Sequence, residues 1–205
     1  MNAADRIPSK KFLAAVESHL GASIAAKTRE RLLPDLEAFP DPGLKELRVH
    51  LCDFMLPGLA LYRTLLDEGR SRDEALETVE AVLRVRCAPR RAEMERMGRM
   101  PFLYPILRLI IRGEMAKECP PEGWDLVWIE NSRDAIRWDV HRCYYVDVFT
   151  KLGVPELVAP YCNTDDYVYD GASKAYSWER KLTLGRGDDR CDFCFAATGR
   201  AGSQD

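Results

Sequence analysis

The chain has 205 residues, of which 46% are hydrophobic and 31% charged, and its formal net charge is −3. This composition is typical of a folded globular protein, and the length suffices for one domain with its own core. Residues 1–118 hold 20 basic against 18 acidic side chains, and residues 119–205 hold 10 against 15. Neither part has the concentrated basic face of a nucleic-acid-binding protein, so we expect no nucleic-acid partner.

No stretch is typical of a secretory leader or a membrane span. Residues 1–13 contain no long apolar run, and the longest apolar stretch, residues 100–111, is interrupted by Arg108 and two prolines. Seven cysteines are scattered along the chain without the spacing of a disulfide framework. We therefore predict a cytoplasmic protein with free thiols and no membrane partner.

Residues 1–118 have the apolar periodicity of helices. The first helix is expected between Ser9, a candidate N-cap, and Gly21, a stop signal. Pro34 predicts a kink or break, and Pro57 predicts two helices in series. A serine and a glutamate three residues apart predict a capping box at the start of a later helix. These two residues are Ser71 and Glu74. The further segments expected to be helical are 22–39, 42–69, 71–87 and 90–115, and the last of them is either one broken helix or two helices.

Residues 119–198 show short aromatic and β-branched segments separated by turns. Two of them, 124–131 and 135–143, predict a β-hairpin, and 144–162 return to helical spacing. Residues 175–195 predict a second hairpin around a Gly-Asp-Asp turn. We therefore expect a single α+β domain over 1–205. It comprises a helical part (1–118), then an antiparallel sheet of about four strands in two hairpins with intervening helices (119–198), and a flexible tail (199–205).

Two cysteines spaced C-x-x-C, Cys191 and Cys194, fall in the last predicted strand. Side chains alternate along a strand, so the two thiols should point to opposite faces and cannot hold one metal ion. No second C-x-x-C completes a zinc ribbon, and the strand–loop–helix setting of a thioredoxin-type motif is missing. We expect neither a metal site nor a cofactor.

The strand 135–143 should place Asp139, His141 and Cys143 on one face, opposite an apolar face. A carboxylate, a histidine and a thiol in one stripe would suit a thiol nucleophile with its base. A solvated polar face that ends in a capping cysteine explains the same spacing, and spacing alone favours this second interpretation.

A second group of polar residues surrounds Cys162. Asp165 and Asp166 follow it by three and four residues, so a continuing helix would place all three on one face. Arg180 would alternate with apolar side chains along a strand, which is an unusual position for a charge. We expect Arg180 either to pair with one of the aspartates or to hold a substrate carboxylate bidentately, and the residues alone leave both open.

Five sequence elements keep one order over about 50 residues of the C-terminal part. They are a cysteine that opens a helix (Cys143), LGVPEL at 152–157, Cys162 with Asp165 three residues later, Arg180 with Thr183 and Leu184, and Gly187 followed by CDF at 191–193. Together they resemble the L-2-amino-thiazoline-4-carboxylic acid hydrolase family. Lys181 and Cys194 depart from the family's usual residues, which bears on substrate choice.

The resemblance implies a hydrolase of cysteine metabolism that cleaves a C–N bond of a cyclic amidine-like thiazoline or a related small carboxylated substrate. It marks three thiols as candidate nucleophiles, without ranking them, and a carboxyl group that moves the proton to the leaving nitrogen. The catalytic candidates are Cys143, Cys162, Cys191 and Asp165. The substrate-binding candidates are Arg180, which would anchor a carboxylate or stabilise developing charge, together with Thr183, Asp166 and His141.

The C-terminal pattern also loosely resembles the 4-vinyl-reductase type of small-molecule-binding domain. In that alternative the three thiols and His141 would form a metal or ligand site without turnover. A third interpretation is an inactive family member kept as a partner protein. The apolar faces of the N-terminal helices are also compatible with a homo-oligomer.

Overall fold

The computed structural model describes residues 9–100 and 102–198, and the predicted tail at 199–205 lies outside them. Contacts between residues group the chain into two compact units, Met1–Arg86 and Cys87–Asp205. The single domain expected over 1–205 stays a prediction. No helix within the described ranges combines the length and apolarity that a membrane crossing needs.

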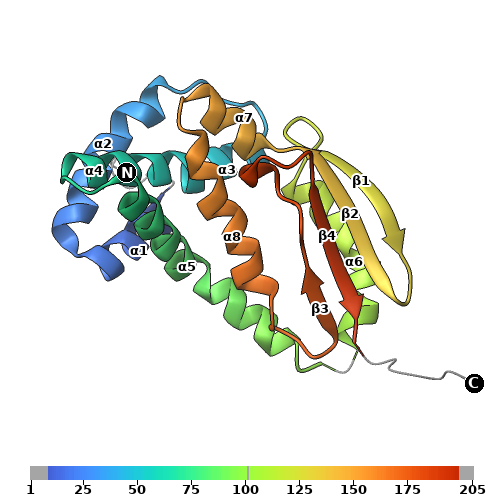
Figure 1. Ribbon diagram of the computed structural model, residues 1–205. Coiled ribbons are helices and arrows are strands. Elements are labelled where there is room, and N and C mark those ends of the chain that lie inside the picture. The colour runs from blue at the N-terminus through green and yellow to red at the C-terminus, as the bar shows by residue number, and fades with distance from the viewer. Residues whose placement is uncertain (1–8, 101, 199–205) are drawn as a thin grey trace, which may run out of the picture. The chain divides into compact units, whose positions relative to one another are not determined.

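The described part of the first unit is helical (Figure 1). Its core consists of aliphatic, methionine and aromatic side chains, with Phe12, Leu32 and Met55 fully buried. The helical segments expected from periodicity are therefore confirmed. In chain order they are α1 (Lys10–Leu20), α2 (Ala22–Ala38), α3 (Lys45–His50), a π-helical turn (Leu51–Met55), α4 (Leu56–Asp67) and the start of α5 (Arg72–Met97).

Several boundary signals in this unit act differently from the expectation. Pro34 does not break its helix, because it lies on the exposed side of the last turns of α2, where water can satisfy the carbonyl that it leaves unpaired. Ser9 precedes α1 but makes no cap hydrogen bond, since its hydroxyl donates to the carbonyl of Cys52 at 2.6 Å. Pro57 stands at the start of α4, as expected for two helices in series.

The predicted capping box before α5 is confirmed. The backbone N–H of Ser71 donates to the carboxylate of Glu74 at 2.8 Å, and the backbone N–H of Glu74 donates to the Ser71 hydroxyl at 3.3 Å. From this start α5 runs past its expected end to Met97. The residues after it form a second helix, so the expected segment 90–115 is divided in two.

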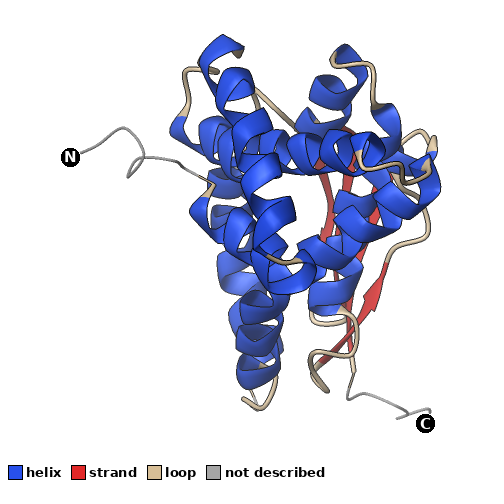
Figure 2. Cartoon of the chain, turned by 90° about the vertical axis from the view of Figure 1, so that its left-hand side faces the viewer, coloured by secondary structure: helices blue, strands red, loops and turns tan. Residues whose placement is uncertain are grey.

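The second unit contains the remainder of α5 and all of the sheet. The four strands form one antiparallel sheet in the order β1-β2-β4-β3 (Figure 1), and strands are drawn in red in Figure 2. The predicted α+β class, with four antiparallel strands and intervening helices, is confirmed. The elements are α6 (Leu103–Glu118), β1 (Asp125–Asn131), β2 (Ala135–Arg142), α7 (Tyr144–Lys151), a 3-10 turn (Pro155–Leu157), α8 (Val158–Tyr169), β3 (Tyr176–Glu179), a 3-10 turn (Leu184–Arg186) and β4 (Cys191–Ala197).

The second hairpin is shorter than expected on its first side. β3 ends at Glu179, so the strand predicted to continue through Arg180 is wrong in its length. The carboxylate of Asp192 accepts the backbone N–H groups of Lys181 at 2.8 Å and Leu182 at 2.5 Å. These donors would otherwise pair with a neighbouring strand, and their capture lets the chain curl into the 3-10 turn before β4.

β4 confirms the alternation predicted for its two cysteines. Cys191 pairs across the sheet with Val140 and Cys194 pairs with Arg137, so the two buried thiols lie on opposite faces. The face of Cys191 is aromatic: the rings of Trp138 and Phe193 are stacked with centroids 5.2 Å apart, and Trp178 and Phe195 are 4.9 Å apart. Helix α8 lies beside this face (Figure 1), where Tyr169 contacts both Trp178 and Phe195.

Candidate functional site

A buried arginine joins the two adjacent aspartates of α8. The side chain of Arg180 is 1% exposed. One guanidinium nitrogen, Nη1, donates to Oδ2 of Asp165 at 3.2 Å, and Nη2 donates to Oδ2 of Asp166 at 2.6 Å and to the carbonyl of Cys162 at 2.8 Å. The guanidinium also lies 5.4 Å from the centroid of the Phe193 ring. The ion pair that the sequence left open is therefore formed, with both aspartates at once.

Asp165 is the carboxyl group of this cluster that is suited to proton transfer. Desolvation raises its pKa to about 6, with smaller increases from Asp166 and Glu118, while Arg180 lowers it. Nevertheless, 42% of the side-chain surface remains exposed, so a small molecule can reach it. A carboxyl group with this pKa populates both its protonated and its ionised form near neutral pH, as a general acid or base requires.

Cys143 stands at the N-cap position of α7, in extended backbone conformation. Burial raises the pKa of its thiol, whereas the backbone N–H groups of Val146 and Tyr145 and the indole N–H of Trp124 lower it. The two backbone N–H groups belong to the first turn of α7, where the peptide dipoles point their positive ends toward the N-terminus. Positive helix-terminal dipoles of this kind favour a thiolate.

Cys162 and Cys191 both contact the 3-10 turn Leu184–Arg186. The backbone N–H of Leu184 donates to Sγ of Cys191 at 3.3 Å. Sγ of Cys162 lies so close to Gly185 that a Cβ atom there would be 2.8 Å from it. Burial raises the pKa of Cys162 to about 12 and that of Cys191 to about 11, so both thiols are protonated at neutral pH and need a base to react.

Asp165 acts electrostatically on all three candidate thiols. Asp165 raises the pKa of each of them, after the larger effect of burial. The same applies to Cys119, the C-cap residue of α6, whose pKa is raised by burial and then by Asp165, Glu118 and Cys143. Sequence reasoning missed Cys119 and Glu118, because neither belongs to a spacing motif and only the tertiary fold brings the end of α6 to α8.

The structure does not bring His141 to this cluster. β2 ends at Arg142, and Cys143 follows it as the N-cap residue of α7. His141 is exposed, and Asp139 pairs instead with Arg190, at 3.3 Å.

Thr183 is 1% exposed, and its backbone N–H donates to the carboxylate of Asp188 at 2.7 Å. Its hydroxyl has no hydrogen-bond partner among the described residues. A buried hydroxyl without a partner costs free energy, so it is a suitable group to bind a ligand.

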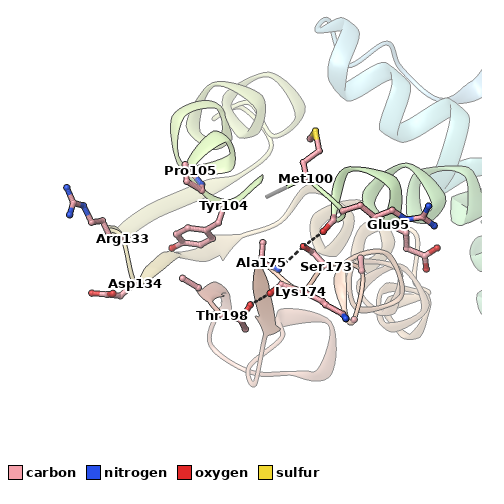
Figure 3. Close-up of a pocket in the computed structure, with 15 residues that line it drawn as sticks. Glu95, Met100, Tyr104, Pro105, Arg133, Asp134, Ser173, Lys174, Ala175 and Thr198 are labelled. Carbon is pink, nitrogen blue, oxygen red and sulfur yellow. Dashed lines mark hydrogen bonds between the residues drawn. The ribbon is translucent and has the colours of Figure 1, made fainter. Parts of the chain in front are cut away.

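A pocket of about 1030 Å³ lies elsewhere in the second unit and contains none of the predicted site residues (Figure 3). Tyr104, Ser173 and Thr198 are among its lining residues. It borders Ala197, at the end of β4 opposite to Cys191. Six residue steps at about 3.3 Å each separate these ends by about 20 Å. The pocket is therefore remote from Cys191.

Within residues 9–100 and 102–198, no group of three or more His, Cys, Asp or Glu side chains is arranged to hold a metal ion. The four cysteines around Asp165 are free thiols.

Comparisons with known proteins bear on the family. No curated protein matches the chain. Two solved structures of an Fe(II) unliganded H-NOX protein from K. algicida have TM-scores of only 0.41. The first is 17% identical, covering 97% of this chain and 98% of that chain, and the second, a point mutant, is 15% identical, covering 95% and 97%.

One protein-family model, that of L-2-amino-thiazoline-4-carboxylic acid hydrolase, matches residues 43–195 of the chain. This range is about three quarters of the chain and includes every predicted site residue. The chain therefore belongs to the L-2-amino-thiazoline-4-carboxylic acid hydrolase family.

Proposed function

We propose that the protein hydrolyses a C–N bond of a small, carboxylated, cyclic amidine-like substrate, at the cluster of Asp165, Arg180 and the neighbouring thiols. The proposal rests on the pKa, the accessibility and the surroundings of Asp165. In a chain of this family, an accessible carboxyl group with a pKa of about 6 lies against a buried arginine and beside several thiols. This combination supplies a proton carrier and a nucleophile in one place.

Asp165 acts first as a base and then as an acid. Near pH 7 it is mostly ionised, because its pKa is about 6, and it can accept the proton of a neighbouring thiol. The same proton is then available for the ring nitrogen as that nitrogen leaves. One carboxyl group thus serves both proton transfers of the ring-opening step.

Cys143 is the thiol that the surroundings favour as nucleophile. Three N–H groups, from Val146, Tyr145 and Trp124, lower its pKa and so oppose the effect of burial. Its sulfur would attack the amidine carbon, and the ring would open as Asp165 protonates the leaving nitrogen. Water would then add to the same carbon, giving its proton to Asp165, and the product would leave as the Cys143 thiol is restored.

Arg180 and Thr183 have different roles in this proposal. Arg180 already donates to two carboxylates and a carbonyl, which supports a positioning role more than capture of a substrate carboxylate. The partnerless hydroxyl of Thr183 is the better candidate for a direct hydrogen bond to substrate.

The test is turnover of 2-amino-thiazoline-4-carboxylate by the purified protein, followed as a product heavier than the substrate by one water. Cys143→Ser, Cys162→Ser and Cys191→Ser are compared with Cys194→Ser, which removes a buried thiol on the other face of the sheet. We expect Cys143→Ser to lower kcat by at least about 100-fold, and Cys194→Ser to change it little.

Two results would contradict the proposal. Undiminished turnover in all three variants would exclude thiol catalysis. Lack of ring opening together with stoichiometric bound zinc, or with a coloured ligand, would favour the binding-module alternative over a hydrolase.

A further inference from the structure

The two aspartates that share Arg180 are held differently. Both oxygens of Asp166 are engaged: Oδ1 accepts the indole N–H of Trp178 at 2.8 Å, and Oδ2 accepts Nη2 of Arg180 at 2.6 Å. Asp165 accepts only the longer bond from Nη1 of Arg180, at 3.2 Å, among its described neighbours. Side-chain exposure hardly distinguishes them, at 42% for Asp165 and 37% for Asp166.

These contacts determine which of the two carboxylates is protonated first beside the shared arginine. Two negative groups beside one cation cannot both be fully compensated, so the pair takes up its first proton on the carboxylate with fewer donors. Asp166 has two short, charge-stabilising bonds, which are lost or weakened if it is protonated. The proton is therefore directed to Asp165.

We propose that the indole N–H of Trp178 is a positioning group that holds Asp166 against Arg180 and thereby leaves Asp165 as the proton carrier of the pair. The inference deepens the proposed function, since it concerns the same carboxyl group, but the arrangement of hydrogen bonds stands without it. Trp178 touches no reacting atom. It acts through Asp166, whose fixed charge holds the Arg180 guanidinium.

Other groups also face Asp165. The charged ones are Asp166 on α8, Arg180 after β3 and Glu118 at the end of α6. The neutral ones are Cys119, Cys143, Cys162, Cys191, Tyr145 and Tyr169, and burial raises the pKa of each. None of these groups donates a described hydrogen bond to Asp166, so only Arg180 and Trp178 discriminate between the two aspartates directly.

The sheet offers a matched control. Trp138 lies on the same aromatic face, stacks on Phe193 and is 3% exposed. Its indole N–H has no hydrogen-bond partner among the described residues. Trp178→Phe therefore removes a bonded N–H and Trp138→Phe removes an unbonded one, while both exchange an indole for a smaller ring in the same cluster.

The experiment is a pH titration of aspartate carboxyl ¹³C chemical shifts in the full chain, with Asp165→Asn and Asp166→Asn used to assign the two signals. In the wild type and in Trp138→Phe, we expect the Asp165 signal to carry nearly all of the change near pH 6. In Trp178→Phe, the change should be divided between Asp165 and Asp166. The acid limb of the pH profile of kcat/KM should move with the Asp165 signal.

Two outcomes would overturn the inference. One is a Trp178→Phe titration identical to that of the wild type. The other is an equal redistribution in Trp138→Phe, which would assign the effect to ring packing. Because the titration needs no turnover, a protein that hydrolyses nothing would contradict the proposed function and leave this result to be judged separately.

Discussion

Replacing Gly185 by alanine tests the contact that brings two of the thiols together. Gly185 lies in the 3-10 turn Leu184–Arg186, and a Cβ atom there would be 2.8 Å from Sγ of Cys162 and 2.8 Å from Cγ1 of Val158. These distances are shorter than ordinary carbon–sulfur and carbon–carbon contacts of about 3.5–4.0 Å. The side chains of Cys162 and Val158, or the elements that carry them, must therefore shift.

The expected cost follows from overpacking. Forcing one methyl group into a packed contact costs about 1–3 kcal/mol, from which the reduced freedom of the unfolded chain offsets about 0.4–1 kcal/mol. At about 2–4 °C per kcal/mol for a chain of this length, the Tm should fall by a few degrees. Because the same movement displaces Cys162 from Asp165, kcat/KM should fall as well.

Gly113→Ala is the matched control. Gly113 lies inside α6, and a Cβ atom there meets nothing within 4 Å, so alanine should stabilise the helix by about 0.5–1 kcal/mol. Urea unfolding followed by circular dichroism compares the two variants. If Gly185→Ala proves as stable as Gly113→Ala, the close packing of the turn on α8 is refuted.

Three further predictions concern protonation, capping and the histidine. Since desolvation raises the pKa of Asp165 from 3.8 to about 6, the folded chain keeps a proton that the unfolded chain has lost. The free energy of unfolding should therefore fall as pH rises between these values, and Asp165→Asn should flatten that slope in urea titrations; an unchanged slope would contradict the assignment. Ser71→Ala removes the acceptor of the Glu74 N–H and should lower the free energy of unfolding by about 0.5–2 kcal/mol, seen as a lower urea midpoint, whereas an unaltered midpoint would show that the capping box contributes nothing. His141→Ala should leave kcat/KM unchanged because His141 is exposed on β2, and a loss of about 10-fold or more would place it in the site.

Local rules in the sequence were sufficient for the features that depend on a few neighbouring residues. The capping box of Ser71 and Glu74 and the opposite faces of Cys191 and Cys194 follow from helix ends and strand alternation. The pairing of Arg180 was among the alternatives, although the strand expected to carry it ends one residue earlier. The rule that a buried charge is rarely unpaired predicted the environment of Arg180 better than the strand assignment did.

Features that depend on tertiary contacts could not be predicted in this way. Asp165 acts on Cys119 across 46 residues of sequence through the tertiary fold, and no motif spacing relates the two residues. The indole N–H of Trp178 donates to Asp166, twelve residues earlier in the chain, and strand alternation does not indicate such a bond. The end of β3 depends on the side chain of Asp192, which captures backbone donors across the turn.

Rapid-quench intact-mass spectrometry of the protein mixed with 2-amino-thiazoline-4-carboxylate shows whether a thiol attacks the substrate. Attack of a thiol on the amidine carbon retains every atom of the substrate, so we expect a transient adduct of the full substrate mass. Peptide mapping should place it on Cys143, and Cys143→Ser should not form it. Repeated turnover without any adduct, at an undiminished rate in Cys143→Ser, would contradict the account.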